Sequence, residues 1–265
     1  MELGVNSATK QSNMLDCFAL LAMTFIGFLL VSPASAAEDP LFSQANAKYQ
    51  AGDFKQAAEL YEKITDSKQA SAAAHYNLGN ALLRIGRKGQ ALVSYKRALA
   101  ITPRDPDIEW NIHVLKSALT DRIEDNTSNI LDVWFRKIID GVTVDETALL
   151  LSFSIGVLCL LSVMQWVFPA SKTPTIGSFQ ALLIVVLVAS AVLFNLKWHD
   201  IKDAQVVVLD REVLARNGPS PDETKAFLLH EGAEASVGDE SKDWYCVTLA
   251  NKNAGWIPKE SCEVV

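Results

Sequence analysis

The chain has 265 residues, of which 49% are hydrophobic and 21% charged, and its formal net charge at pH 7 is −7. This acidic balance, and the lack in the sequence of a basic stripe with interleaved aromatic residues, exclude nucleic acid as a partner. The four cysteines, Cys17, Cys159, Cys246 and Cys262, are spaced neither as a zinc site nor as a CxxC redox pair, so no metal or other cofactor is predicted.

The N-terminal segment has the pattern of an export signal. An apolar run from Leu15 to Val31 is followed by small residues in an Ala-x-Ala arrangement ending at Ala36. Signal peptidase requires small side chains at these two alternate positions, so residues 1–36 are predicted to be a signal peptide cleaved after Ala36. Only Lys10 supplies positive charge before the apolar run, and an uncleaved signal anchor therefore stays open as the alternative.

A helical repeat follows, visible when the chain is compared with itself at an offset of 34 residues. Gly52 then meets Gly86, and Tyr61 meets Tyr95. Glycines at these positions form the turn between two helices, and the rings fill the space between neighbouring helical hairpins. The pattern predicts stacked pairs of helices.

This pattern resembles the tetratricopeptide repeat. The copy from Ala72 to Asp105 carries the family's motif at Leu78-Gly79, Leu82, Ala91, Tyr95, Ala98 and Pro103. The copy from Glu38 to Ser71 keeps only the latter half of the motif, and Asp105 to Asp121 is interpreted as one further helix. Residues 38–125 are therefore predicted to form an all-α tetratricopeptide-repeat domain of two repeats and a capping helix.

Such an array presents a concave groove that binds a peptide or a neighbouring protein. The polar residues expected to face this groove lie on the first helix of each hairpin: Asn46, Tyr49, Asn77, Asn80, Arg84 and Asn111. A spacer or dimerisation element without a peptide ligand is the alternative, because a short array must cover its exposed ends.

The middle of the chain has the pattern of a membrane anchor. Residues 130–140 read as an interfacial amphipathic helix, with Trp134 and Phe135 beside a basic pair. The segments 147–168 and 176–196 contain no charged side chain, and each is long enough to cross a bilayer as a helix. A buried helical hairpin in a soluble domain is the weaker alternative, because two such long apolar runs are rare in globular cores.

The connector between the two apolar segments is so short that both flanks must lie on the same side of the membrane. The export signal predicts that this side is the periplasm, with the hairpin in the bacterial inner (cytoplasmic) membrane and both soluble domains outside. The distribution of positive charge argues for the reverse orientation, because Lys172 is alone in the connector. The flanks carry Arg136, Lys137, Lys197 and Lys202.

Residues 203–265 change to short strands separated by turns, which predicts a small all-β barrel. Gly255-Trp256-Ile257-Pro258, with Trp244 upstream, resembles the bacterial SH3 domain. That resemblance implies binding of peptides or cell-wall material through exposed aromatic residues, here Trp244, Tyr245 and Trp256. The alternative is that a ring such as Trp256 fills the core. A disulfide between Cys246 and Cys262 is left open, since strand geometry decides it.

An enzyme is not expected. The sequence has no glycine-rich phosphate loop, no HExxH and no GxSxG. Cys246 and His230 fall in one predicted domain, but this cysteine lacks the setting that activates a catalytic thiol.

The chain thus reads as a multidomain membrane protein with an all-α tetratricopeptide-repeat domain, a two-helix transmembrane hairpin and a small all-β SH3-like barrel. This order of parts resembles the BatE-like family of the Bacteroides aerotolerance group. The resemblance implies a non-enzymatic envelope scaffold in a stress-tolerance complex. Its implied partners are membrane proteins with von Willebrand A domains and a MoxR-type ATPase. The alternative function is a peptidoglycan-binding or envelope-sensing module that acts through the SH3-like domain.

Overall fold

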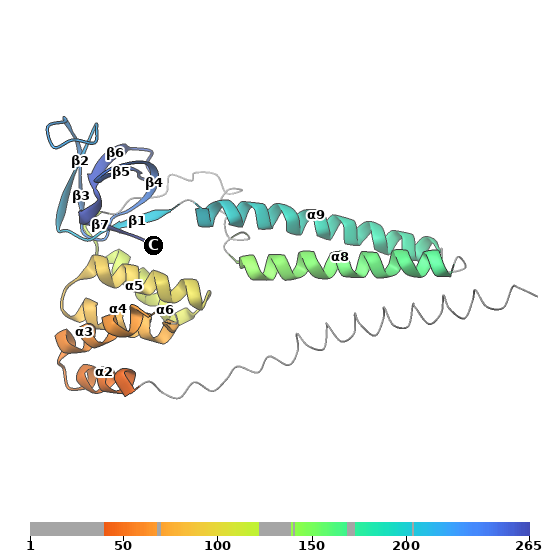
Figure 1. The fold of residues 1–265 in the computed structure, drawn as a ribbon, viewed down its shortest axis with the longest axis horizontal. Helices are drawn as coiled ribbons and strands as arrows, with labels where there is room; N and C mark the ends of the chain where they lie inside the picture. Colours follow the sequence, from red (N-terminus) through yellow and green to blue (C-terminus); the bar gives the residue numbers. More distant parts are fainter. Residues whose placement is uncertain (1–39, 68–69, 122–138, 140, 169–172, 203) are drawn as a thin grey trace, which may run out of the picture. The chain divides into compact units, whose positions relative to one another are not determined.

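The described part of the chain comprises helical hairpins, two long apolar helices and a β-sheet (Figure 1). The structure is a computed structural model that describes residues 40–67, 70–121, 139, 141–168, 173–202 and 204–265. The predicted signal peptide, residues 1–36, lies outside the described residues. So do Lys172 of the connector and, apart from Ile139, the predicted interfacial helix at 130–140.

Two helical hairpins and one further helix form the first folded region. Its helices are α2 (Pro40–Gln50), α3 (Phe54–Thr65), α4 (Ala72–Arg84), α5 (Lys88–Ile101) and α6 (Pro106–Ser117). Gly52 and Gly86, which end the first helix of each hairpin, have φ angles of 80° and 83°. This left-handed conformation is open to glycine at no steric cost, which explains why both copies place glycine at the turn.

The same tyrosine contact holds each hairpin together. The hydroxyl of Tyr61 donates to Oδ1 of Asn46 at 2.5 Å, and that of Tyr95 donates to Oδ1 of Asn80 at 2.7 Å. Both rings are fully buried. Burial raises the pKa of Tyr95, so its phenol stays protonated and remains a donor. The two repeats are therefore equivalent in their internal hydrogen bonds as well as in their helices.

Close packing inside the second hairpin requires a residue without a side chain. Gly79 on α4 faces the ring of Tyr95, and a Cβ atom at this position would lie 2.6 Å from Cε1 of that ring. No real Cβ contact is that short, so any larger residue must push the two helices apart.

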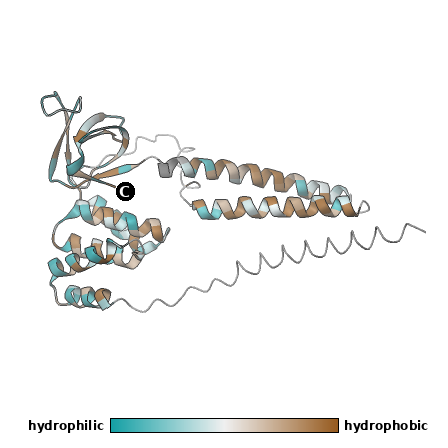
Figure 2. Ribbon diagram, viewed as in Figure 1, coloured by the Kyte–Doolittle hydropathy of each residue, from teal (hydrophilic) through white to brown (hydrophobic). Residues whose placement is uncertain are grey.

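Two long helices follow, α8 (Val144–Val167) and α9 (Pro174–Lys202). Both are long enough and apolar enough to cross a membrane (Figure 2). They pack against each other, with Nε2 of Gln165 donating to Oε1 of Gln180 at 3.2 Å. Helix α8 begins before the charge-free segment because Thr143 and Glu146 form a capping box at its N-terminus.

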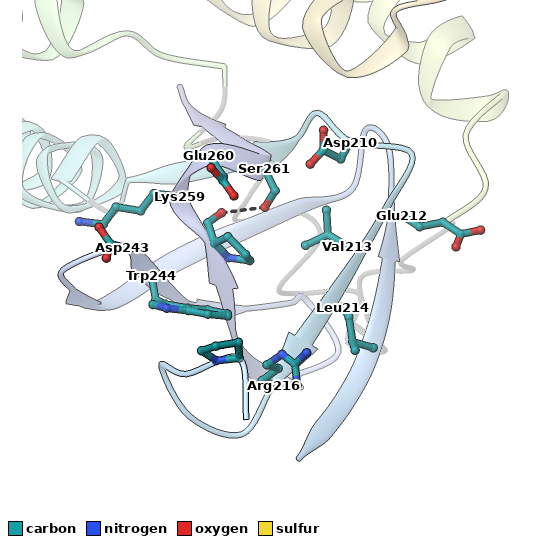
Figure 3. Close-up of a pocket in the computed structure, with 12 residues that line it drawn as sticks. Asp210, Glu212, Val213, Leu214, Arg216, Asp243, Trp244, Lys259, Glu260 and Ser261 are labelled. Atoms are coloured by element: carbon teal, nitrogen blue, oxygen red, sulfur yellow. Dashed lines mark hydrogen bonds between the residues drawn. The ribbon is translucent and has the colours of Figure 1, made fainter. Parts of the chain in front are cut away.

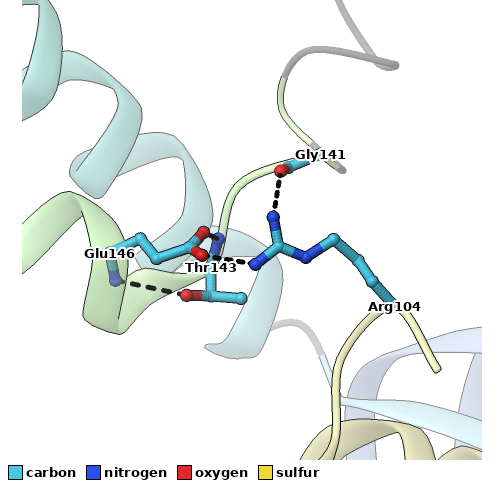
Figure 4. A network of polar contacts seen from close by, with 4 residues as sticks. All are labelled: Arg104, Gly141, Thr143 and Glu146. Atoms are coloured by element: carbon cyan, nitrogen blue, oxygen red, sulfur yellow. Dashed lines mark hydrogen bonds and ion pairs between the residues drawn. The ribbon is translucent and has the colours of Figure 1, made fainter.

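An arginine of the helical region binds the beginning of α8. Arg104 follows α5 with a φ angle of 67°. Its guanidinium donates to the carbonyl oxygen of Gly141 at 3.2 Å and forms an ion pair with Glu146 (Figure 4). Glu146 thus accepts from both Arg104 and the backbone N–H of Thr143. The N-terminus of α8 is tied to the end of the second repeat.

The C-terminal region is a seven-stranded sheet in the order β3-β2-β6-β5-β4-β1-β7, and every pair of neighbours is antiparallel. Its strands are β1 (Gln205–Val208), β2 (Glu212–Arg216), β3 (Lys225–His230), β4 (Glu234–Ser241), β5 (Trp244–Thr248), β6 (Ala254–Pro258) and β7 (Cys262–Val264). Buried residues from strands across the sheet, among them Val206, Val247 and Ile257, form one core. The predicted all-β character is confirmed.

The two cysteines of the sheet are both free thiols. Cys246 lies on β5 and Cys262 on β7, and in the sheet order β4 and β1 stand between these strands. The disulfide that the sequence left open is not formed in this structure. Burial raises the pKa of the Cys262 thiol to about 11, so it is a neutral core side chain.

We expect Gly79→Ala to destabilise the helical region by about 1–3 kcal/mol, because the added methyl group overlaps the ring of Tyr95. Thermal unfolding of the full chain in detergent, followed by circular dichroism, measures the change. Gly156→Ala on α8 is the matched control, since a Cβ there meets no described atom within 4 Å. An unchanged unfolding temperature for Gly79→Ala would contradict the close packing.

We expect Asn80→Ala to cost about 1–3 kcal/mol, because it leaves the buried Tyr95 hydroxyl without its acceptor. Adding Tyr95→Phe removes that orphaned hydroxyl, so the double variant should be more stable than the sum of the two single losses. A double-mutant cycle by chemical denaturation measures the difference. Strictly additive losses would show that the hydrogen bond contributes nothing.

Candidate functional site

Four asparagines form a connected row across the first helices α2, α4 and α6. Nδ2 of Asn77 donates to Oδ1 of Asn46 at 3.2 Å, and Nδ2 of Asn111 donates to Oδ1 of Asn80 at 3.4 Å. Asn77 and Asn80 lie one turn apart on α4, so they join the two pairs. The structure therefore brings together the four asparagines that the sequence assigned to the groove.

The asparagine row keeps unused hydrogen-bonding groups. All four side chains are half-buried rather than covered. Among the described residues, the amide N–H groups of Asn46 and Asn80 have no partner, nor do the side-chain carbonyls of Asn77 and Asn111. The row thus offers donors and acceptors in alternation across three helices, which is the complement of an extended peptide backbone.

The other two predicted residues, Tyr49 and Arg84, meet at an aromatic ring that the sequence analysis did not single out. The guanidinium of Arg84 lies 4.5 Å from the centroid of the Phe54 ring, and Tyr49 packs edge-on against the same ring at 5.1 Å. Arg84 remains exposed and supplies a positive charge one turn beyond Asn80. Phe54 escaped notice because the repeat comparison aligns it with Lys88, so no shared motif marks it.

Tyr76 is a second groove residue that motif reasoning missed. Its hydroxyl accepts from Nδ2 of Asn111 at 2.9 Å, which fixes the amide of α6 against α4. Its position is periodic, since Phe42 and Trp110 stand 34 residues before and after it. That column of aromatic residues was the signal that could have revealed it.

A separate hollow of about 610 Å³ lies on the β-sheet (Figure 3). Of the three predicted aromatic residues only Trp244 lines it. Tyr245 is the next residue on β5 and packs against the core of the sheet, because successive strand residues point to opposite faces. Trp256 is half-buried on β6, opposite Arg216. The structure therefore does not bring the three rings to one site.

The hollow is acidic. Its lining includes the carboxylates of Asp210, Glu212, Asp243 and Glu260. The two basic residues that also line it are engaged elsewhere. Nη1 of Arg216 donates to the carbonyl of Glu223 at 2.7 Å, and Nζ of Lys259 bonds Oε1 of Glu240 at 2.5 Å. An indole ring beside unpaired carboxylates suits a positively charged group.

Comparison with known proteins supports the repeats. Residues 42–106 match the family model described as tetratricopeptide repeat, which spans α2 to α5. The tetratricopeptide repeats predicted from the sequence are thereby confirmed for this segment. No curated protein matches the chain.

Solved structures give only distant likenesses. The type III secretion chaperone SycD of Yersinia enterocolitica in complex with a peptide of the translocator YopD is 14% identical, with a TM-score of 0.29, over 60% of this chain and 98% of that one. A second SycD structure is 15% identical, covering 62% and 89% of the two chains at a TM-score of 0.29. PcrH in complex with the chaperone-binding region of PopD is 17% identical, covering 60% and 96% at a TM-score of 0.29. Scores this low carry no argument about function.

Proposed function

We propose that the chain is a non-enzymatic, membrane-anchored scaffold that binds an extended segment of a partner protein in the groove of α2, α4 and α6. The observation that carries the proposal is the asparagine row with its unused amide groups. An extended peptide presents one N–H and one C=O per residue, and asparagine side chains can pair with both. Backbone recognition of this kind binds a segment by its extended form, while Arg84 would favour a nearby acidic residue.

The two apolar helices supply the anchor in this proposal. Helices α8 and α9 form a hairpin in the bacterial inner membrane, and the repeats and the sheet both lie in the periplasm. The order of the parts, with its resemblance to the BatE-like family, supports an envelope complex linked to stress tolerance. Membrane proteins with von Willebrand A domains and a MoxR-type ATPase are the partners to test.

The second candidate function is binding of peptidoglycan, or sensing of the envelope, through an SH3-like barrel formed by residues 203–265. The acidic hollow beside Trp244 favours it. A ligand with a free amino group next to an apolar surface, as in the peptide part of a cell wall, fits this combination of charge and ring.

Groove binding is tested best with Asn77→Ala combined with Asn111→Ala. Neither residue accepts the buried tyrosine hydroxyls, so fewer folding contacts are lost than with Asn80. We expect the double variant to bind a von Willebrand A-domain partner roughly tenfold more weakly, since two hydrogen bonds are lost. Co-purification from detergent-solubilised membranes measures it. Gln56→Ala, an exposed amide on α3, should change nothing. Equal recovery of the partner by all variants would exclude the groove.

Wall binding is tested by comparing two tryptophans of the sheet. Trp244→Ala removes the ring from the hollow and should reduce retention of the full chain on purified peptidoglycan severalfold. Trp256→Ala removes an equal ring that does not line the hollow and should leave retention unchanged. If Trp244→Ala is retained like the parent chain, the hollow does not bind the wall.

A further inference from the structure

Strand β1 is buried on both faces, although it belongs to a sheet whose neighbouring strands are partly exposed. Val206 and Val208 enter the core of the sheet. Val207 instead enters the core of the helical repeats, where Leu209 also packs. Successive side chains of a strand point to opposite faces, so the apolar run from Val206 to Leu209 serves two cores at once.

The helical surface that receives β1 is the end of the repeat array. Helix α6 stands 34 residues after α4, at the place of the first helix of a third repeat. An array must cover the apolar face of its last repeat, usually with a further helix. Among the described residues, β1 packs on α5 and provides such a cover.

Two glycines allow the surfaces to approach closely. A Cβ atom at Gly89 of α5 would lie 2.5 Å from the carbonyl oxygen of Val208. A Cβ at Gly232, in the turn between β3 and β4, would lie 2.5 Å from Cδ2 of Leu119. Gly232 also has a φ angle of 86°, which favours glycine. One glycine comes from each side of the contact, so backbone meets side chain in two places.

The sheet also supplies the N-terminal cap that α5 lacks. Within the described residues, Arg87 at the N-cap position makes no capping hydrogen bond. Oε1 of Glu231 accepts from the backbone N–H of Gly89 at 2.9 Å, 142 residues further along the chain. A carboxylate at a helix N-terminus satisfies an orphan donor and opposes the positive end of the helix dipole.

Charged pairs surround the apolar contact. Glu234 of β4 lies 3.0 Å from Nζ of Lys96 on α5 and 2.7 Å from Nζ of Lys116 on α6. Burial alone would raise the pKa of Glu234, but the two ammonium groups outweigh it and hold the pKa below its ordinary value. The Asp121 carboxylate accepts from the backbone N–H of His230 at 2.7 Å and contacts its Nδ1 at 2.8 Å.

We infer that the surface of α5 and α6 is a docking site for this chain's own β-sheet, which acts as the cap of an incomplete repeat array. Apolar fit, a borrowed helix cap and complementary charge all meet at this one surface. The docked sheet holds α6, and with it Asn111 of the groove, through Lys116, Leu119 and Asp121. The repeats before the two long helices and the sheet after them form one folding unit.

Hydrogen exchange of the full chain in detergent micelles, without added ligand, tests this docking. Glu234→Lys places three positive charges together and should speed amide exchange in α6 about tenfold, while β5 and β6 keep their protection. Lys116→Glu, made on the helical side, should do the same without altering the sheet. Glu240→Lys is the matched control on the same strand, because Glu240 pairs with Lys259 inside the sheet.

Restoring the charge pattern completes the experiment. Lys96→Glu and Lys116→Glu combined with Glu234→Lys should return the exchange of α6 to nearly the parent rate. Unchanged exchange in α6 for both single reversals would overturn the docking. Protection of α6 that falls on dilution of the parent chain would also overturn it, since a second copy would then supply the sheet. No peptide is present, so failure of the groove proposal leaves this result intact.

Discussion

The burial of β1 on both faces is the constraint on which the arrangement of the soluble regions depends. Burial of one valine side chain contributes about 1.5–3 kcal/mol, and β1 makes that contribution to the core of the sheet and to the core of the repeats. Helix α5 precedes the two apolar helices and β1 follows them. With the hairpin in a membrane, this shared strand requires both soluble regions to lie on the same side.

The contacts of the groove are shared between folding and binding. Asn46 and Asn80 each use their carbonyl to hold a buried tyrosine, and their amide N–H groups stay available. Asn77 and Asn111 extend the row without holding those rings. The first pair therefore carries more of the stability, and the second pair is the better probe of recognition. A polar groove built this way is rigid before its ligand arrives, which lowers the entropic cost of binding.

Repeats, apolar helices and strands were predictable because each follows from a local period. The offset of 34 residues located both hairpins, and the runs without charge located α8 and α9. The asparagines of the groove followed from their place on the first helix of each hairpin. Phe54 and Tyr76 were missed because they depend on which side chains meet across helices. The aromatic site of the sheet was drawn too broadly, since adjacent residues on β5 face opposite ways.

The sequence by itself determined the identity and order of the elements, because helical and strand periods and long apolar runs are properties of neighbouring residues. Only the tertiary structure decided where Val207 is buried and which residue caps α5. Both depend on residues more than one hundred positions apart, such as Gly89 and Glu231, and no local period links them. The apolar run of β1 is consistent with any strand buried on both sides, and the packing of α5 against it specifies the partner.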